Sequence, residues 1–149
     1  MDSTDRAILK LLQTDASLSL DDIAMRIGAS KTPIWNRIKR LKETGVIKRE
    51  VALVDAEAIG LDTCFFVLVK TSEHDAQWQS QFLEALRARN EVVEAHRLAG
   101  EIDYLLKVRV TNARAYDQFY QGLIADVKVF NVTALLSMEE LKYTTALPL

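Results

Sequence analysis

The stretch "LSLDDIAMRIGASKTPIWNRIKRLKETG", residues 18–45, decides the fold of the N-terminal third of the chain. Apolar residues recur at helical spacing over residues 20–27, which predicts a short amphipathic helix. Ser19 is a good N-cap for this helix, and Gly28 stands where a left-handed residue commonly ends one. The helix is therefore expected to begin after Ser19 and to end before Gly28.

A second helix is expected to begin directly after Ser30, whose hydroxyl can cap it. Pro33 falls in the first turn, where backbone N–H groups have no helical acceptor. The apolar row of this helix should pack on the helix before it and on another over residues 5–15, and it consists of Ile34, Ile38 and Leu41. Two helices joined by a tight turn with Gly, the second with an exposed basic face, are typical of a helix-turn-helix.

The exposed side of this second helix is the predicted DNA contact. The residues expected to touch DNA are Ser30, Lys31, Thr32, Trp35, Asn36, Arg37, Lys39, Arg40, Lys42 and, beyond the helix, Lys48. Asn36 can pair bidentately with adenine and Lys39 with guanine, whereas the remaining cations suit phosphates. Two simpler interpretations stay open: basic residues can form only the solvated face of a helix, and Trp35 can belong to the rim of the core.

The net charge of -2 (19 Lys and Arg against 21 Asp and Glu) hides an asymmetry along the chain. Residues 1–50 hold 10 basic and 7 acidic residues, a balance of +3, and the rest hold 9 and 14, a balance of -5. A basic patch on an acidic chain indicates local binding of a polyanion.

Composition argues against several other classes of protein. One cysteine, Cys64, cannot form an internal disulfide and is expected to be a small buried residue, and two histidines without a Cys pair give no metal-ligand spacing. No apolar run approaches the ~20 residues of a membrane helix, and the N-terminus lacks a signal-peptide pattern. We expect a cytoplasmic protein with no membrane partner, no metal, no other cofactor and no catalytic residues.

The chain after residue 61 changes to a β-α-β-β-α-β order, which is the ferredoxin-like plan. The expected strands and helices, in chain order, cover residues 63–71, 76–88, 92–100, 103–110, 112–124 and 131–143. The predicted fold class is α+β, with a winged helix-turn-helix over residues 1–50, a linker strand over 51–61 and a ferredoxin-like domain over 62–149.

One face of the predicted sheet needs a partner. Both helices of this plan cover the same face, yet residues 64–69 are apolar on both alternating faces, as are Leu135 and Leu136. The expected partner is the same sheet of another copy, which gives a two-fold dimer.

Two quoted stretches carry a family resemblance over essentially the whole chain: "DSTDRAILKLLQTDASLSLDDIAMRIGASKTPIWNRIKRLKETGVIKREVALVD", residues 2–55, and "LAGEIDYLLKV", residues 98–108. Together they resemble the Lrp/AsnC (feast/famine) family of transcription regulators. The tail "MEELKYTTALPL", residues 138–149, looks nearest to the cysteine-responsive branch. The resemblance implies binding to double-stranded DNA, dimers that assemble into octamers, and a small amino-acid effector bound between sheet domains.

The resemblance also implies an effector site at the turn from Gly100 to Asp103, which matches the family's G-x-x-D. The expected effector-binding residues are Leu98, Ala99, Gly100, Glu101, Asp103, Tyr104 and, on the last strand, Ser137. Free amides around a glycine and a carboxylate suit the two charged ends of an amino acid. Alternatively, the turn only builds a hairpin.

Two other functions remain compatible with the sequence. Siroheme decarboxylases resemble this architecture, and there His96 and Arg97 would act as acid and anion binder, although a strand histidine is more often structural. An architectural DNA-binding protein without an effector is the second alternative.

Overall fold

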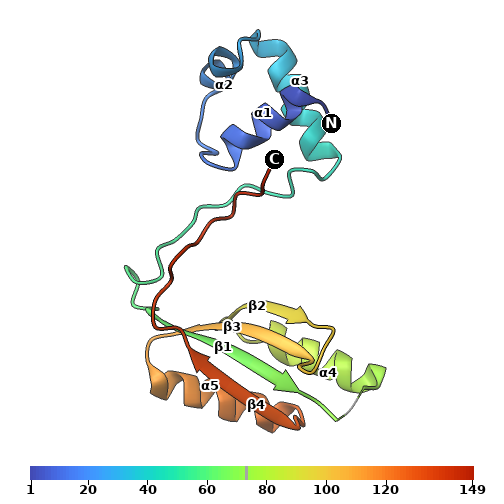
Figure 1. Ribbon diagram of the computed structural model, residues 1–149, viewed down its shortest axis with the longest axis vertical. Helices are drawn as coiled ribbons and strands as arrows, with labels where there is room; N and C mark the ends of the chain where they lie inside the picture. Colours follow the sequence, from blue (N-terminus) through green and yellow to red (C-terminus); the bar gives the residue numbers. More distant parts are fainter. Residues whose placement is uncertain (73) are drawn as a thin grey trace. The chain divides into compact units, whose positions relative to one another are not determined.

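The structure is a computed structural model that describes residues 1–72 and 74–149. It divides into two compact units. One contains residues 1–53 and 141–149, and the other contains residues 54–140. Figure 1 shows three helices in the first unit and a sheet with two helices in the second.

The first unit is the predicted three-helix arrangement, with α1 (Ser3–Leu12), α2 (Leu20–Ile27) and α3 (Lys31–Glu43). Its core joins all three helices through six buried apolar residues, which are Ile8, Leu9, Ile23, Ala24, Ile34 and Leu41. Ile38 is partly buried and packs against them. The apolar row predicted for α3 is thus confirmed.

Capping residues set the bounds of α2 as the sequence predicts. The Ser19 hydroxyl accepts a hydrogen bond from the Asp22 backbone N–H at 3.1 Å, and Gly28 closes the helix with a φ of 75°. Ser30 holds the N-cap position of α3, but its side chain makes no capping hydrogen bond to the described residues of that helix. The predicted capping role of the Ser30 hydroxyl is therefore wrong, although the helix begins where expected.

The predicted linker strand over residues 51–61 is not formed. All of residues 44–62 are described, and they contain no strand. A strand exists only where its backbone groups find a neighbouring strand, and none pairs with this segment in the described chain. The first unit also extends to Leu53 and includes the tail from Leu141 to Leu149, so it is larger than the expected residues 1–50.

The second unit has the predicted β-α-β-β-α-β order. Its elements are β1 (Thr63–Lys70), α4 (Ala76–Arg87), β2 (Val92–Arg97), β3 (Tyr104–Val110), α5 (Ala113–Asp126) and β4 (Asn131–Leu136). The strands form one antiparallel sheet in the order β2-β3-β1-β4. The last strand ends at Leu136 and not at 143. Its pairing neighbour β1 begins at Thr63, which the register places opposite Met138, so residues 139–143 have no partner on β1.

Both helices pack on one face of this sheet (Figure 1). Every second residue of β1 is buried against them, namely Phe65, Val67 and Val69. Phe82 of α4 and Leu123 of α5 are fully buried in the same cluster. Cys64 is also buried, as expected of a small apolar side chain.

Candidate DNA-binding helix and effector loop

The outward face of α3 carries polar side chains near the start of the helix. Thr32, Asn36 and Lys39 follow each other at i, i+4 and i+7, on the side opposite the buried row of Ile34 and Leu41. All three are exposed. An exposed row of amide, hydroxyl and ammonium groups on one helix face is suited to base edges in a major groove.

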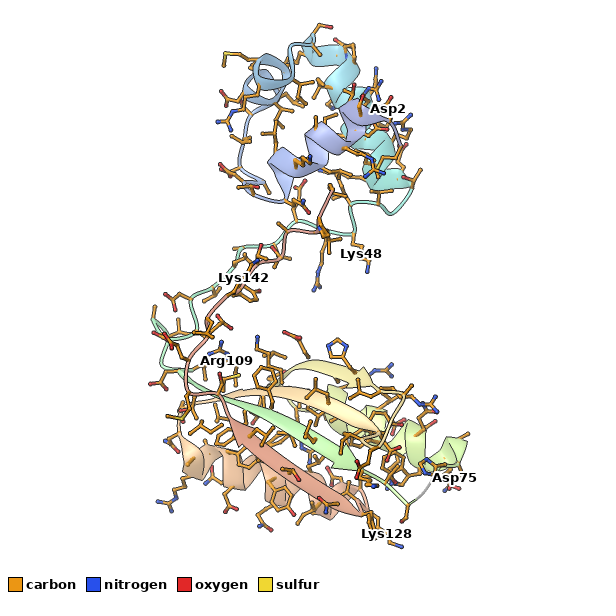
Figure 2. All side chains as sticks on the ribbon, in the orientation of Figure 1. Asp2, Lys48, Asp75, Arg109, Lys128 and Lys142 are labelled. Carbon is orange, nitrogen blue, oxygen red and sulfur yellow. The ribbon has the colours of Figure 1, made fainter. Side chains whose placement is uncertain are left out.

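Three lysines of α3 form ion pairs with exposed acids of the same unit. Lys31 Nζ lies 2.8 Å from Asp21, Lys42 Nζ lies 2.8 Å from Glu50, and Lys39 Nζ lies 3.8 Å from Glu43. Exposed pairs contribute only ~0–1 kcal/mol, so phosphates can replace the acids at little cost. Lys48, labelled in Figure 2, is exposed on the segment after α3.

Trp35 lies at the rim of the helical core. Its side chain is half exposed and lines an apolar groove with Leu12 and Ile23. The Lys39 ammonium lies over the Trp35 ring, 5.3 Å from the ring centroid. This position supports the rim interpretation of Trp35.

Arg37 and Arg40 are engaged with two aspartates of α1 (Figure 2 labels Asp2). Arg37 Nη1 donates to Asp2 Oδ2 at 2.7 Å and to Asp5 Oδ1 at 2.8 Å. Arg40 Nη2 donates to Asp5 Oδ2 at 2.7 Å and to Asp5 Oδ1 at 2.9 Å. The sequence suggested two free phosphate-binding cations, whereas the fold places both beside carboxylates more than thirty residues earlier.

These contacts shift the pKa values of the groups involved. Burial on its own would raise the pKa of Asp5, but the hydrogen bonds from Arg37 and from the Asp2 backbone, with the charge of Arg40, lower it overall. The pKa of Asp2 is lowered by the Asp5 backbone N–H and by Arg37, and the pKa of Arg37 is raised by hydrogen bonds to Asp2 and Asp5. The cluster therefore consists of two carboxylates and two guanidinium groups, all charged at neutral pH.

The predicted effector loop joins β2 to β3. Leu98, Ala99, Gly100 and Glu101 are exposed, and Gly100 has a φ of 152°. The Asp103 carboxylate accepts a hydrogen bond from the Thr71 N–H at 2.8 Å, and the Asp103 N–H donates to the Val69 carbonyl at 3.1 Å. Asp103 thus holds the loop against the end of β1, which gives it a structural task besides any ligand contact.

Of the other two predicted effector residues, Tyr104 lines a small pocket with Leu98 and Asp103, whereas Ser137 lies apart from the loop. Tyr104 is buried, with its ring 4.8 Å from that of Phe82. The Ser137 N–H donates to the Cys64 carbonyl at 2.9 Å, at the opposite end of β1 from Val69. Five residues of strand separate these ends, roughly 16 Å at 3.3 Å per residue. Within one chain, the fold does not bring Ser137 to the loop.

Three residues near the loop are absent from the predicted effector set, and the sequence singled out one of them, Arg97, only for the decarboxylase alternative. Lys70 Nζ lies 3.7 Å from Glu101 on the loop, and Arg97 and His74 line a small polar pocket beside Asp103. A single lysine at the end of the apolar strand "TCFFVLVK" was the available signal. His96 is exposed and lies 3.6 Å from Glu94.

The described residues show neither a metal-binding cluster nor a membrane-spanning helix. No group of three or more His, Cys, Asp and Glu side chains there is arranged to hold a metal ion. In the same residues, every helix is too short or too polar to cross a bilayer.

Two family models match the two parts of the chain. The model described as winged helix-turn-helix DNA-binding matches residues 1–48, and the Lrp/AsnC ligand binding domain matches residues 64–147. The first model thus covers the helices whose exposed face is described above, and the second covers the sheet and the loop.

Characterised relatives match over nearly their full length. The DNA-binding transcriptional activator DecR of Escherichia coli K12 is 42% identical across 100% of this chain and 99% of its own. The glutamate uptake regulatory protein of Zymomonas mobilis is 43% identical across 100% of this chain and 91% of its own.

Solved structures share the same architecture. An AsnC family transcriptional regulator from Agrobacterium tumefaciens is 42% identical, with a TM-score of 0.96 over 99% of this chain and 97% of its own. A Neisseria meningitidis transcriptional regulator solved as a complex with L-Met is 29% identical, with a TM-score of 0.95 over 99% and 96%. With two matching family models and relatives above 40% identity along the whole chain, this protein belongs to the Lrp/AsnC family of transcriptional regulators.

Proposed function

We propose that this protein is a DNA-binding transcriptional regulator whose activity is controlled by a small amino acid. The observation that carries the proposal is the union, in one chain, of an exposed polar face on α3 with a sheet unit that matches the Lrp/AsnC ligand binding domain. The names of the relatives support both halves, since one is a DNA-binding activator and another was solved with L-Met.

On DNA, Thr32, Asn36 and Lys39 read base edges, while Lys42 and Lys48 neutralise phosphates. Asn36→Ala should relax the preference at one base pair, because a bidentate amide-adenine contact is worth ~1–3 kcal/mol. Lys48→Ala should weaken binding to all sequences and make the salt dependence of log K shallower by about 0.9. Lys10→Ala, an exposed lysine on α1, removes the same charge and should leave the slope unchanged.

A second copy of the chain covers the open face of the sheet. That face carries partly buried Phe66, Leu68 and Leu105 with exposed Leu135. Beside them Lys107 and Arg109 pair with Glu140 at 3.7 and 3.5 Å. An apolar centre with a charged border is suited to a two-fold contact between identical sheets.

The oligomeric state tests this part of the proposal. Phe66→Asp should shift the protein toward monomer in sedimentation equilibrium, because a charge would be buried at the centre of the contact. Leu83→Asp, on the outer side of α4, should leave the assembly unchanged. Equal assembly of the wild type and Phe66→Asp would show that another surface joins the copies.

The effector contacts the exposed loop 98–101, and the position of Ser137 supports a site shared between copies. Because Ser137 and the loop lie at opposite ends of β1, a small ligand that touches both must take them from different chains. Assembly and effector binding are then linked.

Thermal unfolding against a panel of the twenty amino acids tests the effector. A ligand at ~100 times its dissociation constant should stabilise the folded protein by about 2.7 kcal/mol. A shift with one or a few amino acids, cysteine and methionine among the candidates, would identify the signal. A flat panel, also flat with DNA present, would favour an architectural DNA-binding protein.

We propose no catalytic activity, no metal and no prosthetic group for this cytoplasmic regulator. The exposed position of His96 supports this, since an acid catalyst is usually enclosed with its substrate. Mixing the protein with a tetrapyrrole and recording its absorbance tests the decarboxylase alternative, and a spectral change would support it.

A further inference from the structure

Asp5 is a charged residue in the core of the DNA-binding unit. Its side chain is 2% exposed, and its carboxylate accepts hydrogen bonds from Arg37, from Arg40 and from the Asp2 backbone N–H. A buried carboxylate is costly unless it is paired, so the two guanidinium groups of α3 are what keep Asp5 charged in this position.

The two arginines are held in different ways. Arg37 is 30% exposed, and its Nη1 is shared between Asp2 and Asp5. Arg40 is 56% exposed, and its Nη2 bonds to Asp5 alone, so each arginine uses a single nitrogen and the two differ in exposure and in the number of carboxylates they bind. The N–H groups on Nη1 and Nε of Arg40 donate to no group in the described part of the chain, so they remain open to a ligand.

Arg40 also lies on the side of α3 that reads DNA. It follows Asn36 by four residues and so shares a helix face with it. A guanidinium fork is suited to a phosphate, and holding a long side chain in place before binding reduces the conformational entropy that binding costs.

We propose that Asp5 is a positioning residue that orients Arg40 toward a DNA phosphate, while Arg37 joins α3 to the start of α1. This inference rests on the proposed DNA-binding function. It assigns different roles to Arg37 and Arg40, for which the sequence predicts the same phosphate-binding role. It also means that Asp5 of α1 affects DNA binding through Arg40 of α3.

The change in DNA affinity caused by Asp5→Asn has opposite signs if Asp5 positions Arg40 and if Asp5 acts only through its charge. Asp5→Asn removes one negative charge from the unit, and by charge alone it should tighten binding to DNA. If Asp5 orients Arg40, the same substitution should weaken binding about ten-fold, the scale of one charge-assisted hydrogen bond. The probe is a mixed-sequence duplex of about 30 base pairs, titrated over a series of salt concentrations.

Asp2→Asn is the matched control. It changes the charge of the same cluster equally, keeps an N-cap of equal quality, and touches Arg37 but not Arg40. It should bind as tightly as the wild type or more tightly. Arg40→Ala should bind about ten-fold more weakly with a salt slope shallower by about 0.9, and adding Asp5→Asn to it should cause no further loss.

Circular dichroism at the assay temperature shows whether Asp5→Asn is folded. If it is not, Arg40→Lys replaces it, since lysine keeps the charge without the oriented fork. It should bind more weakly with an unchanged salt slope. A folded Asp5→Asn that binds as tightly as Asp2→Asn, or an Arg40→Lys equal to the wild type, would overturn the inference. Failure of the wild type to bind any duplex would instead overturn the proposed function.

Discussion

Asp5 is both buried and charged, so protonation of its carboxylate at low pH should destabilise the fold directly. The pKa values of Asp5 and Asp2 are lowered in the folded protein relative to their ordinary values near 3.9. Groups of this kind stabilise the fold fully above the unfolded pKa and lose that contribution as the pH falls through the folded pKa. The DNA-binding unit therefore depends on two carboxylates that must stay ionised.

We predict that the midpoint temperature of thermal unfolding decreases as the pH is lowered from about 5 to about 2. The decrease should be smaller for Asp5→Asn. Circular dichroism melts of both proteins across this range measure the difference. Asp15, whose pKa is lowered by its hydrogen bonds with Ser17, should leave a residual acid dependence in the variant. Equal falls in the two proteins would contradict the role of Asp5.

Asp103 is the residue where structural and ligand-binding tasks meet. Asp103→Ala removes the acceptor of the Thr71 N–H and should lower the free energy of unfolding by about 1–2 kcal/mol. Asp103→Asn keeps an acceptor there and should cost less, but it removes the charge available to an effector. We predict that both variants lose the amino-acid response in thermal shift assays while DNA affinity stays near normal. A normal amino-acid response in Asp103→Asn would show that the charge of Asp103 does not contact the effector and that its role is structural.

At the scale of the elements, caps and apolar periodicity decide where helices begin and end. α2 begins after Ser19, whose hydroxyl accepts a hydrogen bond from a backbone N–H, and ends at Gly28, which has a left-handed conformation. α5 likewise begins after Asn112, whose side chain accepts from the Ala115 N–H at 2.9 Å. These signals act within four residues, which is why the sequence predicts them well.

Ser19 and Ser30 form a natural pair for testing the capping contribution. Both hold N-cap positions, but the hydroxyl of Ser19 bonds to Asp22 whereas that of Ser30 caps nothing in its helix. Ser19→Ala should lower the free energy of unfolding by about 1 kcal/mol, and Ser30→Ala should change it little. Urea denaturation without DNA measures both. Equal losses would mean that the backbone conformation, and not the hydroxyl bond, carries the effect.

Strands depend on partners in a way that helices do not. Residues 51–61 find no strand to pair with in the described part of the chain, and residues 139–143 extend past the start of β1. Alternating apolar residues therefore predicted the centres of the strands and overestimated the length of β2, expected to reach residue 100, and of β4.

At the scale of the whole chain, the C-terminal tail belongs to the DNA-binding unit. The Gln13 side-chain amide donates to the Leu147 carbonyl at 2.8 Å and accepts from the Leu147 N–H at 2.9 Å. Leu149 packs against the helical core. The chain thus passes between the two units twice, after Leu53 and after Glu140.

We predict that Gln13→Ala lowers the free energy of unfolding by about 1–2 kcal/mol, because two hydrogen bonds to the tail are lost. Removing residues 146–149 should cost more, since Leu149 then leaves the core as well. Gln118→Ala, an exposed glutamine of α5, is the control and should have little effect. Urea denaturation of the three variants measures the order, and a stable truncated protein would contradict the anchoring role of the tail.

The sequence by itself determined the helix-turn-helix, the β-α-β-β-α-β order, the buried row of α3 and the polar residues opposite it. Those features rest on periodicity and caps, which are local. Only the tertiary structure decided that Arg37 and Arg40 meet Asp5, that the tail binds Gln13, and that Ser137 lies at the far end of β1 from the loop. These contacts join residues from 32 to 134 positions apart or depend on strand register. Such distances close only when the hydrophobic cores form, because burial brings the segments together and no local pattern specifies which side chains then meet.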